Sequence, residues 1–159
     1  MLRLQKSLKE RTTKHLEPFM GVRSYRELTV WQLGIDLVHE VYQATRRFPK
    51  SEVYGLTSQI QRAAVSIPSN IAEGQQRDST KDFLRHLSIA LGSLAELNTL
   101  LAICDRLSYL QSESLNSMGH KAETIGKMLR ALQKSLKRKI QFTNHQPPTT
   151  NHQPPTTSH

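Results

Sequence analysis

The chain has 159 residues, of which 36% are hydrophobic and only 6% aromatic, a composition typical of one domain with a helical, aliphatic core. Its 22 Lys and Arg residues exceed its 13 Asp and Glu residues, and the resulting net charge of +9 favours a polyanionic partner. The one cysteine, Cys104, excludes an internal disulfide and predicts a cytoplasmic protein. We expect no secretory signal, no segment apolar and long enough to cross a bilayer, and no membrane partner.

Residues 1–22 form a basic N-terminal extension that we expect to be flexible. Their leucines are scattered, and Glu10 and Glu17 interrupt the basic face, which argues against a helix lying on a membrane. The bundle domain is predicted at residues 23–141.

The first helix is predicted from about Arg26 to Arg47. Leu28, Trp31 and Ile35 begin an apolar stripe with spacings of three and four, and a second stripe runs beside it. A face this wide indicates contacts with two neighbours.

The second helix is predicted at about residues 53–73. Pro49 is expected to end the helix before it, Ser51 to cap the new one, and Gly74 to stop it. Its apolar face contains Pro68, which has no backbone donor and frees the carbonyl of Ala64. We therefore expect a kink at Pro68, with hydrogen bonds to the freed groups from nearby polar side chains, namely Ser66, Ser69 and Asn70.

Ser79 is expected to cap the third helix, with Asp82 at the acidic third position. Two long seams follow, from Phe83 to Cys104 and from Leu115 to Leu136, and a short turn joins them into an antiparallel hairpin. With the first two helices as a second hairpin, the sequence predicts an all-α, antiparallel up-and-down four-helix bundle. Gly92 in the third helix indicates close approach of another helix.

Residues 142–159 form a tail in which the heptad Asn-His-Gln-Pro-Pro-Thr-Thr occurs twice in succession. Paired prolines favour extended chain and no apolar residue is available for a core, so we expect the tail to be disordered.

The run FPKSEVYGLTSQIQRAAVSIPSNIAEG, from Phe48 to Gly74, carries a family resemblance together with Leu28 to Gln32 and Ile89 to Leu97. It resembles the 23S rRNA intervening-sequence protein family over roughly Tyr25 to Ile140. This resemblance implies a helical bundle that associates into a pentameric ring and has no enzymatic activity. Related accessory variability determinant proteins of diversity-generating retroelements bind nucleic acid and a reverse transcriptase.

The residues themselves also argue against catalysis, so we expect no catalytic residues, cofactor or metal. Gly-rich phosphate loops, CxxC pairs and serine nucleophile motifs are absent from the sequence, and Cys104 has no evident base. Bundle metal sites need two carboxylate and histidine pairs, whereas Asp36 and His39 form one.

A non-enzymatic, oligomeric nucleic-acid-binding protein is the leading hypothesis. Cations crowd the last helix, although cations near a helix C-terminus are also favourable for the helix dipole. Scarce aromatic residues argue against base stacking on exposed rings. The candidate nucleic-acid contacts are Arg62, Arg77, Arg85, Lys127, Arg130, Lys134, Lys137, Arg138 and Lys139.

Asn70 and Glu73 follow the proline and share a helix with Arg62. We expect the three to form a hydrogen-bonded network that fixes the kink or an inter-subunit contact, in preference to recognising a ligand. The structural or interface residues predicted are therefore Pro68, Asn70, Glu73 and Gly92.

Two alternative functions remain open at this stage. The first is a protein-interaction adaptor or scaffold that uses its remaining apolar face, for example toward a reverse transcriptase, without binding nucleic acid. A helix-turn-helix regulator is a weaker alternative, because the turn between the second and third helices is long and no base-reading set follows it.

Overall fold

The computed structural model describes residues 24–143. The predicted extension at residues 1–22 lies outside the described residues, and so does the predicted tail apart from its first two residues, which end the last helix. The described chain is all-α and contains no β-strand. In chain order the elements are η1 (Tyr25–Glu27), α2 (Thr29–Thr45), η2 (Lys50–Glu52), α3 (Leu56–Gln75), α4 (Thr80–Arg106) and α5 (Ser112–Thr143).

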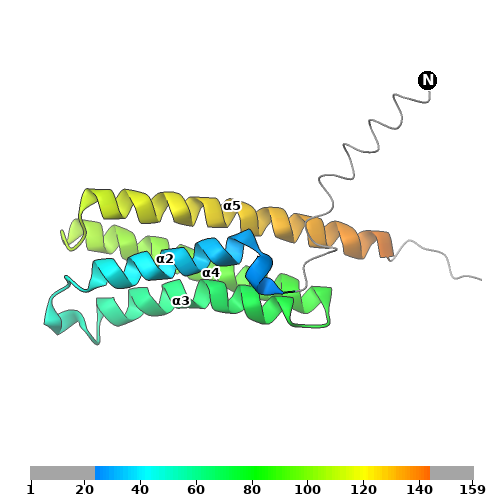
Figure 1. Cartoon of the computed structure of the whole chain (residues 1–159), viewed down its shortest axis with the longest axis horizontal. Coiled ribbons are helices and arrows are strands. Elements are labelled where there is room, and N and C mark those ends of the chain that lie inside the picture. Colours follow the sequence, from blue (N-terminus) through cyan, green and yellow to red (C-terminus); the bar gives the residue numbers. More distant parts are fainter. Residues whose placement is uncertain (1–23, 144–159) are drawn as a thin grey trace, which may run out of the picture.

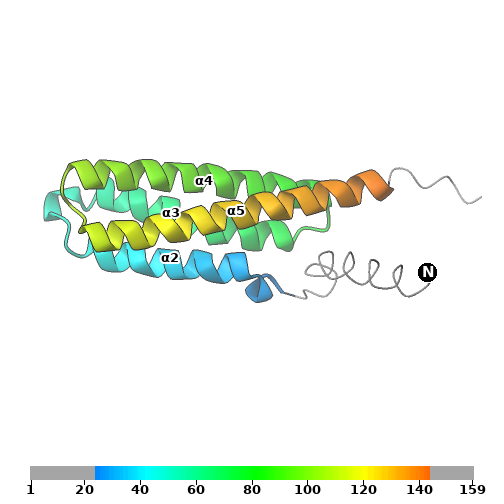
Figure 2. The same ribbon diagram turned by 90° about the horizontal axis from the view of Figure 1, so that it is seen from above.

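The four α-helices lie side by side, and each runs opposite to the one before it (Figure 1). α3 packs between α2 and α4, while α5 contacts α4 and returns to α2, so the neighbours close a cycle. The turned view shows the same arrangement, with α5 extending past the ends of its neighbours (Figure 2). The connections from α2 to α3 and from α4 to α5 therefore lie at one end of the bundle, and the α3–α4 turn lies at the other.

The predicted seams form the core. Ile67 and Ile71 of α3, Leu87 and Leu97 of α4, and Leu129 of α5 are all fully buried. Burying one such side chain stabilises a fold by roughly 1.5–3 kcal/mol. The periodicity of three and four in the sequence thus predicts which side of each helix faces its neighbours.

α4 is long and apolar enough to cross a membrane by length and composition, so the expectation that no segment would meet this criterion is wrong. Helices from the core of a bundle meet the same criterion. Phe83, Leu87, Leu97 and Cys104 of α4 are all buried against the other helices in this structure.

Helix ends agree only in part with the predictions. Ser79 caps α4, because its Oγ accepts a hydrogen bond from the backbone N–H of Asp82 at 3.4 Å. Ser51 does not cap α3: the Glu52 carboxylate accepts from the backbone N–H of Leu56 at 3.1 Å. α3 also continues through Gly74 to Gln75, so Gly74 is not its stop.

Pro68 lies inside α3, which is one helix on both sides of it. Ser69 Oγ donates to the carbonyl of Val65 at 2.8 Å, and Asn70 Nδ2 donates to the carbonyl of Ser66 at 2.8 Å. Two of the three predicted side chains thus bond carbonyls one turn earlier, although these are not the carbonyl of Ala64. Gly34 of α2 lies against the proline ring, since a Cβ added at Gly34 would be 3.3 Å from Pro68 Cβ.

Candidate nucleic-acid interface

The last helix carries the largest cluster of candidate residues. With about 100° between successive residues of an α-helix, five of the six α5 candidates fall within an arc of about 100°. All five are exposed, and together they extend about 16 Å along the axis at 1.5 Å per residue. We call this set the α5 stripe; it consists of Lys127, Arg130, Lys134, Lys137 and Arg138.

Lys139 is not part of the α5 stripe. It follows Arg138 by one residue and therefore points about 100° further round the helix. Lys127 belongs to the stripe but has an internal partner, because its Nζ lies 2.6 Å from Glu123 Oε1. That hydrogen bond and the lysine charge hold the pKa of Glu123 below its ordinary value. Four stripe cations in the described structure are left without an ion pair.

The other three candidates lie elsewhere. Arg62 is exposed on α3, which packs against α2 and α4, and it lines a shallow hollow with Glu96. Arg85 is exposed on α4. Arg77 follows the end of α3 and forms an ion pair with Glu73. The structure therefore brings five of the six α5 candidates together and leaves Arg62, Arg77, Arg85 and Lys139 outside the α5 stripe.

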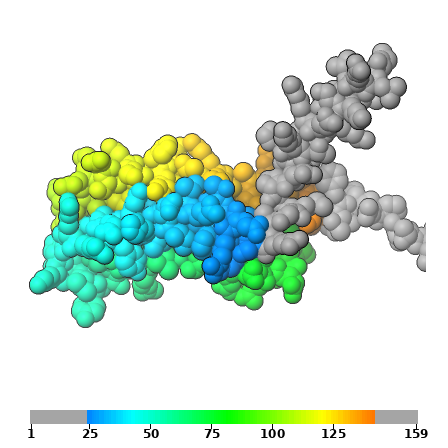
Figure 3. Space-filling view, viewed as in Figure 1, coloured from blue at the N-terminus to red at the C-terminus, as the bar shows by residue number. Residues whose placement is uncertain are grey.

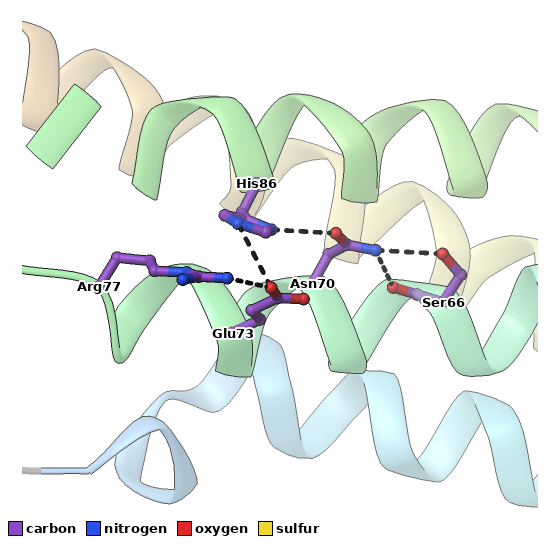
Figure 4. A network of polar contacts seen from close by, with 5 residues as sticks. All are labelled: Ser66, Asn70, Glu73, Arg77 and His86. Atoms are coloured by element: carbon purple, nitrogen blue, oxygen red, sulfur yellow. Dashed lines mark hydrogen bonds and ion pairs between the residues drawn. The ribbon is translucent and has the colours of Figure 1, made fainter. Parts of the chain in front are cut away.

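Asn70 and Glu73 do form a polar network, but with partners other than Arg62 (Figure 4). Asn70 Nδ2 donates to Ser66 Oγ at 3.1 Å, and Asn70 Oδ1 lies 3.2 Å from His86 Nδ1 across the α3–α4 interface. His86 Nε2 is in turn 3.8 Å from Glu73 Oε1, which Arg77 also contacts.

The predicted network with Arg62 is wrong for a geometric reason. Arg62 precedes Asn70 by eight residues, or about 12 Å along the helix, whereas Arg77 follows Glu73 by four and shares its face. Ser66 Oγ also meets Ser93 Oγ at 2.8 Å, so the network spans a long stretch of the α3–α4 contact. Its role in the described structure is to join two helices.

Gly92 does not have the close contact predicted for it. A Cβ added there would meet nothing within 4 Å, and the residue is exposed. The close approach occurs at Gly74, where an added Cβ would lie 2.6 Å from His86 Cβ and 2.8 Å from Phe83 Cδ2. Gly74 therefore allows α4 to approach α3.

Sequence reasoning missed a second basic surface at the α2–α3 connection. Arg46, Arg47 and Lys50 are exposed there, between the exposed tyrosines Tyr42 and Tyr54. The signal was present in the run YQATRRFPKSEVY, which alternates aromatic and basic residues. Its residues were considered only as the end of the first helix and as part of the run that carries the family resemblance, so their shared aromatic and basic character was overlooked.

The groups considered for catalysis are placed as follows. Cys104 is fully buried in the core, and burial raises the pKa of its thiol to about 11. Asp36 and His39 are exposed on α2, and His39 Nε2 lies 3.2 Å from Gln43 Nε2. Within residues 24–143, no three His, Cys, Asp or Glu side chains gather in a way that would hold a metal ion.

The described residues form a four-helix bundle protein. Comparison with known families identifies the family to which this bundle belongs. The model of the 23S rRNA-intervening sequence protein family matches residues 26–131, so the chain belongs to that family. The resemblance stated from the sequence is thereby confirmed.

A solved structure shares this architecture. It is a protein of unknown function from the S23 ribosomal protein family of Bacteroides thetaiotaomicron, with 25% sequence identity and a TM-score of 0.62. The similarity covers 67% of this chain and 99% of that one. No curated protein matches the chain.

Proposed function

We propose that this protein is a non-enzymatic, oligomeric bundle that binds RNA or DNA through the α5 stripe. The observation that carries the proposal is the gathering of five exposed cations on one face of α5, of which only Lys127 has an ion pair within residues 24–143. Phosphate groups are the polyanionic partner that such a row of exposed cations attracts.

The helix dipole does not account for the α5 stripe. α5 continues to Thr143, so Arg138 precedes the end of the helix by five residues and Lys127 by sixteen. The favourable effect of a cation on the dipole is confined to the last turn. A surface role for the stripe is therefore the better explanation.

We further propose the finer features that the family resemblance implies: a kink at Pro68 and a pentameric ring. In a ring, several copies of the α5 stripe would act on one polyanion, which compensates for weak single contacts. Exposed apolar side chains at Val65 and Ile89, together with the open surface at Gly92, support association through the outer face of α3 and α4. We place the protein in the cytoplasm, with no cofactor and no membrane partner.

The test is binding of the full chain to duplex DNA, single-stranded DNA and structured RNA across a salt series. Five phosphate contacts predict a slope of log K against log salt of about −4.5 on a duplex and about −3.5 on a single strand, per chain. The double variant Arg130→Gln/Lys134→Gln should flatten the slope by about 2.

The matched control removes the same charge from exposed cations of α4, as Lys81→Gln/Arg106→Gln. It should weaken binding far less than the stripe variant. Equal losses from the two variants would show that net charge, and not the α5 stripe, governs binding.

A protein-interaction adaptor is the second candidate, and the exposed apolar residues Ile89 and Ile103 of α4 and Leu107 at its C-cap favour it. In this case the chain would bind none of the three nucleic acids even at low salt. A reverse transcriptase would then be the first protein partner to test, with Ile103→Ser as the variant that weakens the contact.

A further inference from the structure

The ten residues that join α2 to α3 are held against the bundle at two points. Phe48 is only 8% exposed, and its ring packs on Tyr109 with 5.4 Å between centroids. Glu52 receives hydrogen bonds from the backbone N–H of Leu56 at 3.1 Å and from the hydroxyl of Tyr109 at 3.4 Å. Partial burial beside this carboxylate raises the pKa of Tyr109 above its ordinary value. The connection thus has a defined conformation.

This conformation directs Tyr54 into solvent. Its side chain is 97% exposed, and Tyr42 on the neighbouring face of α2 is 43% exposed. The two rings line a shallow hollow with Val53, Val65 and Arg62, and Arg62 is the one charged residue that the described part of the chain contributes to its lining. In the space-filling view, the connection forms one end of the molecule on the face shown (Figure 3).

The tyrosines are accompanied by cations that have no ion pair within the described residues. Arg46 is the C-cap residue of α2, one helical turn after Tyr42, and Lys50 lies in the anchored connection. Of the nearby carboxylates, Glu52 is bonded as described above and Glu40 pairs with Lys121 at 2.7 Å. Glu113 lines the adjacent hollow beside Arg46 and Arg47. The cations Arg46, Arg47, Lys50 and Arg62 therefore outnumber the carboxylates Glu52, Glu113 and Glu96 around the two rings.

Rings of this kind suit an unpaired base. The faces of a base within a duplex are covered by its neighbours, whereas an unstacked base can lie on an aromatic ring while cations contact its phosphates. Stacking on an exposed ring is also tolerant of sequence, since every base has a π-face. The scarcity of aromatic residues in the chain therefore does not exclude stacking, because two of its four tyrosines are exposed at this one place.

We propose that Tyr54 and Tyr42, with Arg46, Lys50 and Arg62, form a base-stacking subsite for single-stranded nucleic acid. We call it the Tyr54 surface. The inference rests on the proposed function and narrows its substrate class to a strand with unpaired bases, such as a loop or a single-stranded end. The α5 stripe contacts phosphates of single-stranded and duplex nucleic acid alike. The Tyr54 surface supplies the preference for single strands over duplexes.

The experiment compares Tyr54→Ala with the native chain on a 20-nucleotide single strand, a duplex of the same length and an abasic strand of the same charge. Because stacking contributes about 1–3 kcal/mol per base, we expect a loss of about 5- to 160-fold on the normal single strand. Binding to the duplex and to the abasic strand should change less than twofold. Tyr54→Phe, which keeps the ring, should bind as the native chain does.

The outcomes separate this inference from the proposed function. If Tyr54→Ala binds the normal single strand like the native chain while Arg130→Gln/Lys134→Gln is weakened, the base-stacking subsite is wrong and the α5 stripe stands. If the native chain binds no nucleic acid, both proposals are wrong. Poly-glutamate, an acidic chain without bases, is the last probe. If the native chain binds it and Tyr54→Ala weakens that binding as much as it weakens binding of the single strand, the Tyr54 surface binds acidic protein segments and the stacking subsite is wrong.

Discussion

The α3–α4 and α2–α3 connections, at opposite ends of the bundle (Figure 1), differ in how their charged residues are used. At the α3–α4 end, Arg77 and His86 contact Glu73, and Asn70 joins His86 to α3. At the α2–α3 end, Arg46 and Lys50 have no ion pair within the described chain. The net charge of +9 therefore does not mean that unpaired cations are distributed evenly over the surface. Charged groups beside the α3–α4 connection thus contribute to a helix contact, whereas Arg46 and Lys50 of the α2–α3 connection stay available to a partner.

The lengths of the two connections explain this contrast. Only residues 76–79 separate α3 from α4, so polar groups of the two helices face each other across a close contact that Gly74 permits. Residues 46–55 separate α2 from α3 and turn outward around the buried Phe48. In this longer connection Arg46 and Lys50 form no ion pair within the described residues, although Glu113 of α5 lines the same hollow as Arg46.

The largest expected effect comes from releasing the anchored connection. Phe48→Ala removes a buried ring from the contact with Tyr109, and we expect the free energy of unfolding to fall by about 3–5 kcal/mol. Urea denaturation measures the loss, and alkylation of the buried Cys104 reports opening of the same end. Tyr54→Ala serves as the control and should cost less than about 0.5 kcal/mol. Equal stabilities of the two variants would contradict the anchoring role of Phe48.

Gly74→Ala tests the paired end. Alanine is the better helix former, yet its Cβ would lie 2.6 Å from His86 Cβ, so α4 must move away. We expect a net loss of about 1–3 kcal/mol in unfolding free energy, together with a changed NMR chemical shift for the His86 ring. A variant as stable as the native chain would show that the two helices separate here without cost.

Gly92→Ala is the matched substitution at a glycine with open surroundings. It should raise the stability of a single chain by about 0.5–1 kcal/mol, because alanine loses less backbone entropy and meets nothing within 4 Å. If Gly92 lies in the ring interface, the same variant will dissociate the oligomer in sedimentation experiments. An intact oligomer with increased stability would place the interface elsewhere.

The smallest effect is expected from Arg77→Gln. Its ion pair with Glu73 is half-exposed, and such pairs contribute about 0–1 kcal/mol. Affinity for a single strand should also change little, because this guanidinium already has a partner, whereas Arg46→Gln should weaken binding and reduce the salt slope by about 1. A larger loss of affinity from Arg77→Gln would remove the distinction drawn between the two ends.

The sequence predicted the helices far better than the contacts between them. Seams such as Phe83 to Cys104 are determined by burial over many turns, so the four helices and their inward sides were evident. Helix ends depend on small differences in local hydrogen bonding. The first backbone N–H of α3 is therefore bonded by Glu52 and not by the predicted cap, Ser51. His86 became the partner of Asn70 only through the packing of α4 on α3, which no pattern within one helix reports.

The site was predicted to a similar extent. Five α5 cations share a face because they lie on one helix, whose geometry is known in advance. The exposure of Tyr54 depends on where the connection is anchored, and that in turn depends on Phe48 meeting Tyr109, 61 residues later in the chain. Non-local contacts of this kind leave no periodic trace in the sequence.

The contact between Gly34 and Pro68 fixes the position of α2 along the axis of α3. Sliding α2 by one turn would bring Val30 or Val38 against the proline ring, where a Cβ already has only 3.3 Å of space. The last turn of α2 therefore reaches the same point beside α3 in every copy of the protein. The spacing between Tyr42 and Arg62 is thus set about two turns away from either residue, at the middle of the bundle.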